Sequence, residues 1–64
     1  MSNFRELSFL HDGDYFSFEN KIYKVDWGLD EPSNAIHLKT GTYCYIDETI
    51  RVKWLKNYEK LTLV

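Results

Sequence analysis

Two aspartates near the start of the chain are the first residues whose types and spacing could do chemistry. Asp12 and Asp14 flank Gly13, and a strand through them would place both carboxylates on one side, where their oxygens can hold a divalent cation. Such a cation takes more oxygen ligands than two, and no third acidic residue is close in the sequence. The alternative is a turn in which Asp12 and Gly13 lead into a strand and Asp14 accepts backbone N–H groups. We predict the turn, and no metal site.

Three other reactive side chains are scattered along the chain. His11 and His37 have no serine or cysteine partner at the spacing of a catalytic arrangement, and together with Cys44 they form no zinc-ligand pattern. No basic residue adjoins Cys44 to favour its thiolate, so we expect a small, inert, buried side chain. A chain of 64 residues also has little interior for a substrate. We predict a protein that is not an enzyme and uses no cofactor.

Tyrosines in residues 42–46 are better candidates for a function. Apolar residues alternate onto both faces of this segment. In one arrangement Cys44 and Ile46 point inward, and Tyr43 and Tyr45 then form an exposed patch of the kind enriched at protein interfaces. In the other arrangement the tyrosines lie in the core and Cys44 lies outside. Either way, one face of the strand is expected to meet a partner or a second copy of the chain.

Length and charge narrow the class of protein. The 64 residues form one domain, and a domain of this size buries only about 60% of its unfolded surface. Because 17% of the chain is aromatic, a compact core is expected, and a homodimer can complete it. The net charge of −2 combines an acidic part, residues 1–48, with a basic end, residues 49–64. No apolar run is long enough for a signal peptide or a membrane span, so we expect a cytoplasmic protein.

The sequence predicts that β-strands position these residues. Alternation with aromatic and β-branched residues predicts five of them, at 15–18, 22–27, 35–39, 42–46 and 49–55. Turns are predicted at 19–21 and 40–41, with Gly41 at positive φ, and the longest loop at 28–34. The side chains predicted to face inward are Phe16, Phe18, Tyr23, Val25 and Trp27. In the last strand, one face is predicted to carry Ile50, Val52 and Trp54 and the other Arg51 and Lys53.

The ends of the chain are less regular. Residues 3–10 have apolar spacing typical of a short helical turn or an irregular lead-in. The tail turns at Asn57 into a short edge strand, or residues 54–61 form a helical turn instead. Short strands and tight turns in so small a chain predict a mainly all-β fold, a strongly bent five-stranded antiparallel sheet or an SH3-like barrel. An open sheet packed against an N-terminal helix is the alternative.

The succession GDYF, NKIYKV, NAIHLKTG and YIDETIRV, within residues 12–52, resembles small accessory proteins of bacteriophages and related mobile elements. The resemblance implies a compact SH3-like barrel and no catalytic residues. It also implies a role in binding and inhibiting a protein of the bacterial host, including components of antiviral defence. The loop from Trp27 to Pro32 and the two tyrosines around Cys44 depart from the family pattern, which makes them candidates for contacts specific to this chain's partner.

Two functions from different classes remain. The first is a protein-binding module whose partner-binding residues are Tyr43, Tyr45, Leu29, Asp30 and Glu31. The second is a nucleic-acid-binding barrel in which tyrosines, including Tyr15, stack on bases while basic residues contact phosphates; those basic residues are Arg51, Lys53 and Lys56. The acidic balance of the chain favours the first.

Overall fold

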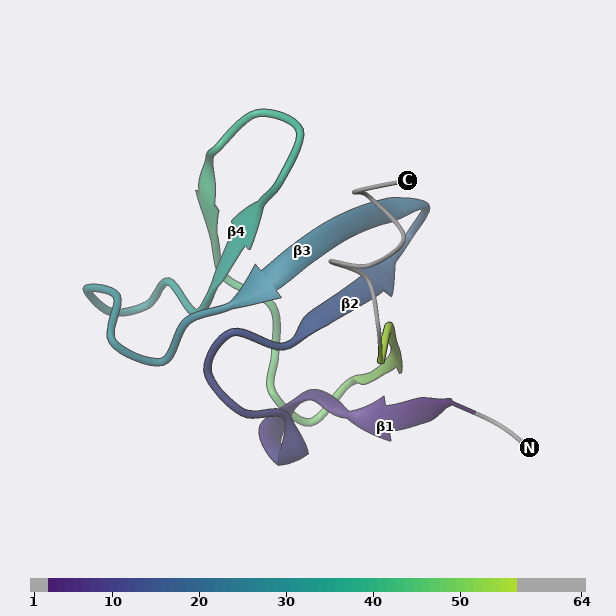
Figure 1. Ribbon diagram of the computed structural model, residues 1–64. Helices are drawn as coiled ribbons and strands as arrows, with labels where there is room; N and C mark the ends of the chain where they lie inside the picture. Colours follow the sequence, from purple (N-terminus) through teal and green to yellow (C-terminus); the bar gives the residue numbers. More distant parts are fainter. Residues whose placement is uncertain (1–2, 57–64) are drawn as a thin grey trace.

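The computed structural model describes residues 3–56 and shows an all-β protein (Figure 1). Six antiparallel strands form one sheet in the spatial order β1-β6-β2-β3-β4-β5. In chain order the elements are β1 (Phe4–Glu6), a 3-10 turn η1 (Leu7–Phe9), β2 (Tyr15–Phe18), β3 (Lys21–Val25), β4 (Ala35–His37), β5 (Tyr43–Cys44) and β6 (Arg51–Trp54).

The predicted all-β class is confirmed, and each of the five predicted strands overlaps one of β2 to β6. The additional strand, β1, lies in the segment for which the sequence predicted a helical turn, and the turn itself follows as η1. β1 was missed because a three-residue strand has no visible alternation, and only its pairing with β6 defines it. The predicted tail from residue 57 onward lies outside the described residues, and Trp54, where the alternative helical turn was predicted to begin, is the last residue of β6.

The sheet is strongly bent. Figure 1 shows the β4 hairpin rising steeply from β3, while β1 lies on the other side of the central β2–β3 hairpin. Within residues 3–56, β1 and β5 each pair with one strand only, so they form the two edges of the sheet. The bend brings side chains from one face of every strand toward a common interior, as a partly closed barrel does.

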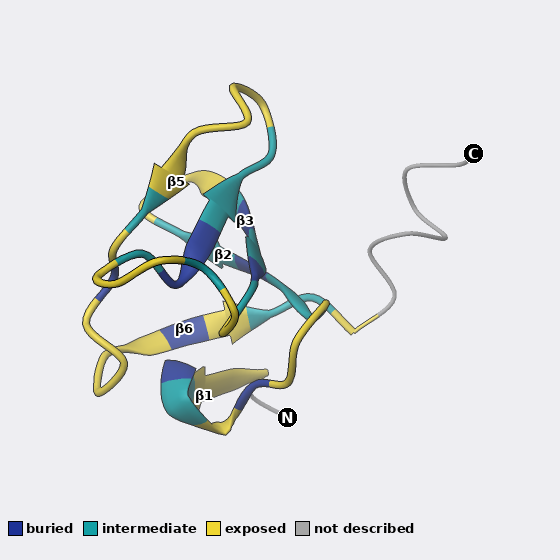
Figure 2. Cartoon of the chain, turned by 90° about the vertical axis from the view of Figure 1, so that its left-hand side faces the viewer, coloured by how far each residue is buried: buried dark blue, intermediate teal, exposed yellow. Residues whose placement is uncertain are grey.

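The core lies on the concave face because apolar residues alternate along the central strands. Figure 2 shows the buried positions, which come from β2, β3, β4 and β6, from η1 and from the segments after η1 and β5: Leu7, Leu10, Phe16, Tyr23, Val25, Ala35, Ile46 and Val52. Phe18, Cys44 and Trp54 pack against them. Trp54, Phe16, Tyr23 and His37 form one cross-strand row, in which the rings of Phe16 and Tyr23 stack with centroids 5.3 Å apart. Cross-strand aromatic pairs of this kind stabilise a sheet beyond the area they bury.

The predicted side-chain directions of two residues are wrong. Trp27 is 38% exposed because β3 ends at Val25, so the alternation no longer sets the direction of its side chain. Ile50 is 36% exposed because it precedes β6, in a turn that its N–H closes by donating to Asp47 O at 3.0 Å. In both cases the sequence alternation continues beyond the hydrogen-bonded strand.

The hairpin turns differ in length from the predicted ones. β2 and β3 are joined by Glu19 and Asn20 alone, both at positive φ, as a two-residue hairpin with right-handed strand twist requires. Between β4 and β5 the loop spans residues 38–42, because these strands are shorter than predicted. Gly41 has φ +74, so the prediction of positive φ there is confirmed.

Candidate functional site

The aspartate corner that precedes β2 is a turn. Gly13 has φ +88, and its N–H donates to Val25 O at 2.9 Å. Asp14 Oδ2 accepts the N–H of His11 at 2.9 Å, which confirms the predicted role of this carboxylate. Asp12 makes a long-range hydrogen bond that the local sequence does not indicate. Its Oδ1 accepts the backbone N–H of Trp27 at 2.6 Å. Among residues 3–56, His, Cys, Asp and Glu side chains form no group of three that could hold a metal ion.

The side chains with possible catalytic chemistry take part in local structure instead. His37 Nδ1 lies 2.8 Å from Thr40 Oγ1, and that hydroxyl donates to Thr42 Oγ1 at 2.8 Å, so the three side chains bridge the β4–β5 loop. Cys44 is half-buried, packs against the core and donates its S–H to Thr42 O at 3.5 Å. Burial raises the pKa of Tyr23, and the charges of Cys44 and Glu19 add to this effect.

Tyr43 and Tyr45 are exposed. Their exposed fractions are 61% and 59%, while Ile46 is buried and Cys44 packs against the core. Of the two arrangements that the sequence left open, the structure therefore has the tyrosines outside. The two exposed aromatic side chains on an edge strand and its continuation leave a large apolar area in water, which a partner can cover.

Tyr45 is brought to the long loop after β3. A hollow of about 300 Å³ is lined by two segments of the chain, which we call its walls: one contributes Tyr45 and Glu48, and the other contributes Trp27, Leu29, Glu31, Pro32, Ser33 and Asn34. We call it the Trp27–Tyr45 hollow. Three of the predicted partner-binding residues, Tyr45, Leu29 and Glu31, line it together. Asp30 and Tyr43, the other two, are not among its lining residues, although both are exposed.

Asn34 holds the two walls of the hollow together. Its side-chain amide donates to Ile46 O at 2.7 Å and accepts the N–H of Ile46 at 3.0 Å, so it pairs with this residue as a neighbouring strand would. Its backbone N–H also donates to Cys44 O at 3.0 Å. The Asn34 side chain is buried, and in such surroundings two satisfied hydrogen bonds are much stronger than in water. The sequence suggested only a turn former here.

Trp27, at the other end of the same loop, is also held in place. Its indole Nε1 donates to Leu10 O at 3.0 Å, and its backbone N–H is bound by Asp12. Two residues at the start of the chain therefore orient a side chain in the loop 27–34. The sequence marked Trp27 only as the start of a candidate loop and did not single out Glu48, because the nearness of both to Tyr45 depends on contacts between distant segments.

Exposed acidic groups continue beyond the hollow. Asp47 precedes Glu48, and hydrogen bonds from the backbone N–H and the hydroxyl of Thr49 lower the pKa of its carboxyl group. The charged form of Asp47 is therefore favoured next to the hollow. The loop side adds Asp30 and Glu31, both exposed.

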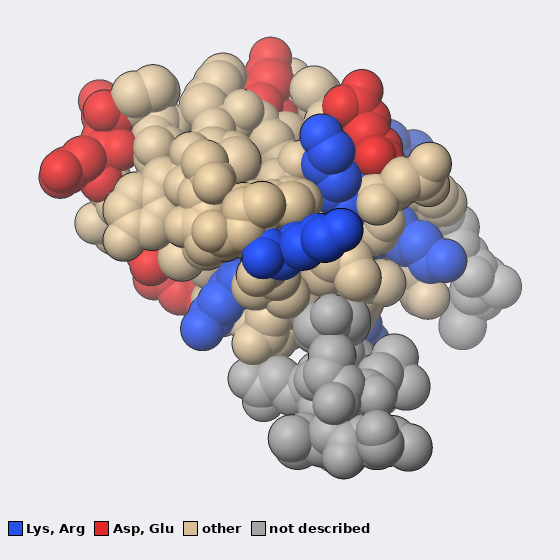
Figure 3. Space-filling model, turned by 90° about the horizontal axis from the view of Figure 1, so that it is seen from above, with Lys and Arg blue, Asp and Glu red and all other residues tan. Residues whose placement is uncertain are grey.

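The predicted nucleic-acid-binding residues lie on the outer face of the sheet. Ser17 pairs with Lys53, so Tyr15, two residues earlier on β2, shares that face. A second row runs across four strands through the pairs of Tyr15 with Lys24, Lys24 with Ile36, and Ile36 with Tyr43. Arg51 and Lys56, the remaining predicted basic residues, are exposed at the start of β6 and just after its end. Figure 3 shows lysine and arginine side chains across the middle of the face seen from above, with acidic side chains toward its rim.

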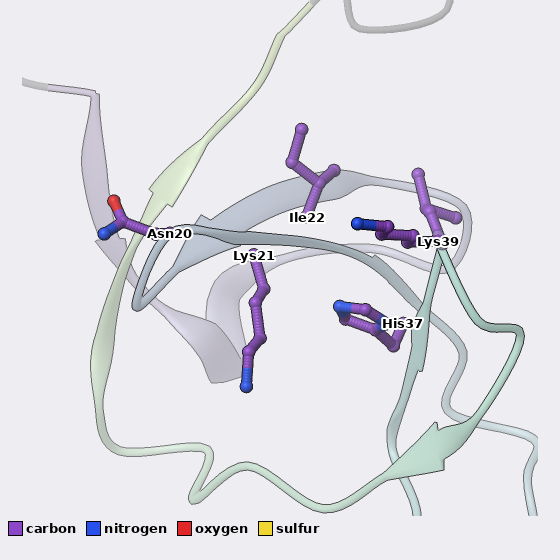
Figure 4. A pocket seen from close by; sticks show the side chains of 6 residues that line it. Asn20, Lys21, Ile22, His37 and Lys39 are labelled. Carbon is purple, nitrogen blue, oxygen red and sulfur yellow. The ribbon is translucent and has the colours of Figure 1, made fainter.

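A second hollow, which the sequence did not predict, lies where β3 begins and β4 ends. It measures about 550 Å³ and is lined by Asn20, Lys21, Ile22, His37, Leu38 and Lys39. Figure 4 shows Lys21 and His37 on one side of the β3 ribbon and Ile22 on the other, as strand alternation requires. The lining carries basic groups and no acidic residue. The two hollows thus have opposite electrostatic character.

Comparisons of the chain with protein families, with curated proteins and with solved structures found no match. No helix in residues 3–56 is long and apolar enough to span a membrane.

Proposed function

We propose that the protein is a non-enzymatic protein-binding module that uses the Trp27–Tyr45 hollow and the neighbouring Tyr43 to bind its partner. The observation that carries the proposal is that Tyr45 and the loop residues Leu29 and Glu31 line one hollow. Tyrosine and tryptophan dominate interface energetics because they bury a large area and keep a polar group. Here both residue types occur together, partly exposed, on a concave surface.

The rigidity of the hollow also supports binding. Asn34 ties the loop to Ile46, and the hydrogen bonds from Trp27 to Leu10 and Asp12 tie it to the start of the chain. A surface that is already ordered loses less conformational entropy when a partner binds, so more of the contact energy contributes to affinity.

The resemblance of residues 12–52 to phage accessory proteins supports a more specific proposal. The partner is then a protein of the bacterial host, bound in its cytoplasm, and binding inhibits or modulates that protein. The departures from the family pattern include Trp27 and Tyr45, which line the hollow. A partner-specific surface is expected to differ among accessory proteins with different targets.

Affinity capture with a double variant tests the proposal. Tagged protein incubated with host lysate should retain one partner in a fixed stoichiometry, identified by mass spectrometry and then confirmed by calorimetry with the purified partner. Tyr43→Ala with Tyr45→Ala should lose that partner and keep the fold, because both side chains are exposed. Phe9→Ala, which removes another exposed aromatic side chain outside the hollow, should retain it. A double variant that binds as the natural chain does would place the site elsewhere.

A nucleic-acid-binding barrel is the second candidate, and the outer row of Tyr15, Lys24, Ile36 and Tyr43 favours it. Aromatic and basic side chains on one sheet face can stack on bases and contact phosphates. This function requires that affinity for a single-stranded oligonucleotide falls steeply with added salt and that Lys53→Gln weakens it. Fluorescence anisotropy that detects no binding even at low salt would exclude it.

A further inference from the structure

We propose that the Trp27–Tyr45 hollow receives an arginine side chain of the partner protein. This inference rests on the proposed function, and it adds the chemical class of the group that enters the site. It follows from the acidic charge of the lining, from the exposed rings of Trp27 and Tyr45, and from the hydrogen bond that the Trp27 indole N–H already makes.

The lining is acidic and contains no basic residue. Glu31 comes from the loop after β3 and Glu48 from the segment after β5, and both are exposed. Asp47 stands next to Glu48 with its charged form favoured by Thr49. Such a surface repels acidic segments and attracts a cation, and complementary charge of this kind directs both encounter and specificity. The hollow between β3 and β4 has a basic lining, so the negative charge of the Trp27–Tyr45 hollow is a local feature of the surface.

The aromatic walls favour a cation over a neutral polar group. Trp27 is 38% exposed and Tyr45 is 59% exposed, so both present ring surface that a partner can cover. The indole N–H of Trp27 already donates to Leu10 O at 3.0 Å. Trp27 therefore has no side-chain donor left for a ligand, and its exposed surface interacts through the ring, whose negative potential attracts a cation.

Arginine suits this site better than lysine does. Its guanidinium group is planar, stacks on aromatic rings and donates two hydrogen bonds to one carboxylate. The protein already contains such a pair within its own fold, because the guanidinium carbon of Arg5 lies 4.4 Å from the ring centroid of Trp54. A hollow of about 300 Å³ is at the small end of the range for ligand pockets, so it fits a side chain better than a large ligand.

Short peptides test the proposal without the natural partner. In ¹H–¹⁵N correlation spectra, acetyl-Gly-Arg-Gly-amide should shift the indole resonance of Trp27 and the backbone amides of residues 27–31, 33–34 and 45–48. Acetyl-Gly-Lys-Gly-amide should bind more weakly, and acetyl-Gly-Gln-Gly-amide should cause no shifts there. Shifts of equal size with the arginine and glutamine peptides, or none with arginine, would overturn the proposal.

Matched variants show whether charge and ring surface are both used. Glu31→Gln and Glu48→Gln should each weaken the arginine peptide by about two- to five-fold, as expected for an exposed ion pair. Glu19→Gln removes the same charge from the β2–β3 turn and should leave affinity unchanged. Tyr45→Leu keeps an apolar side chain but removes the ring, and it should weaken arginine binding; unchanged binding in all three hollow variants would contradict the site.

The two proposals fail in distinguishable ways. If the arginine peptide does not bind but the tyrosine double variant loses the captured partner, the hollow binds a different group. If the arginine peptide binds the hollow but the double variant retains its partner, the cation site exists and the partner uses another face.

Discussion

At the scale of single residues, Asn34 is the side chain on which the hollow depends. Asn34→Ala would leave the N–H and the C=O of Ile46 without their partners in a buried place, at a cost of about 1–3 kcal/mol each in the free energy of unfolding. Urea denaturation should therefore show a strongly destabilised protein. Asn34→Asp keeps the acceptor but loses the donor and should also destabilise.

Ser33→Ala is the matched control for this variant, because it changes the preceding residue and leaves the Asn34 amide in place. It should unfold at nearly the same urea concentration as the natural chain. If Asn34→Ala is as stable as Ser33→Ala, the contact between Asn34 and Ile46 does not hold the two walls together.

The carboxyl group of Asp47 gives a prediction about pH. Its pKa is lowered in the folded chain by the N–H and the hydroxyl of Thr49. The resulting stabilisation is therefore complete above the pKa of an unfolded aspartate and is lost as pH falls through the lower, folded pKa. Thr49→Val removes the hydroxyl bond, so the pKa of Asp47 should rise toward its usual value in an NMR titration.

Thr49→Ser keeps a hydroxyl at the same position and should leave the Asp47 pKa low. The direction is what matters, because Asp47 is exposed and its contribution to stability is small. A pKa that does not respond to Thr49→Val would mean that the backbone N–H alone accounts for the shift.

At the scale of secondary structure, the β2–β3 turn contains a residue that the geometry disfavours. Glu19 has φ 51 and Asn20 has φ 65, a conformation that asparagine and glycine adopt more readily than glutamate does. The combined change Glu19→Asn and Asn20→Gly should raise the free energy of unfolding by about 1 kcal/mol. Thermal unfolding should show a higher midpoint, and Glu19→Val, with a β-branched side chain, should show a lower one.

The contact of Arg5 with Trp54 stabilises the pairing of the short edge strand β1 with β6. Arg5 pairs with Val52 across the strands, and its guanidinium lies over the Trp54 ring. Arg5→Gln should lower the free energy of unfolding by about 0.5–1 kcal/mol, the range for an exposed cation–π pair. Lys53→Gln, which removes a positive charge from the outer face of β6, should change stability less. Equal losses in both variants, measured by urea denaturation, would assign the effect to net charge.

At the scale of the whole molecule, the edges of the sheet bear on self-association. Phe4 in β1 and Phe9 in η1 are 52% and 71% exposed, next to an edge that pairs only with β6 in the described part of the chain. The homodimer predicted from the sequence would cover such groups. Light scattering should then report twice the 7.7 kDa of one chain, and Phe9→Ser should shift the population toward monomer. A natural chain that scatters as 7.7 kDa would contradict the dimer.

Interactions between residues that are close in the sequence determined the all-β class of the fold and several of its turns. The alternation in residues 15–25 and 51–54, the glycines at positions 13 and 41 and the carboxylate of Asp14 all act on neighbours in the chain. These interactions are short in sequence, so their pattern can be read without coordinates. The predictions for Trp27 and Ile50 were wrong because alternation does not show where a strand stops pairing.

Only the tertiary structure decided which residues meet to form the candidate site. The direction of Tyr43 and Tyr45 was open in the sequence, because both faces of that strand are apolar. The bonds from Asp12 to Trp27 and from Asn34 to Ile46 join segments 15 and 12 residues apart, and no local preference encodes them. Both form because the bent sheet brings these segments together, and for the buried Asn34 side chain a hydrogen-bond partner is also required there.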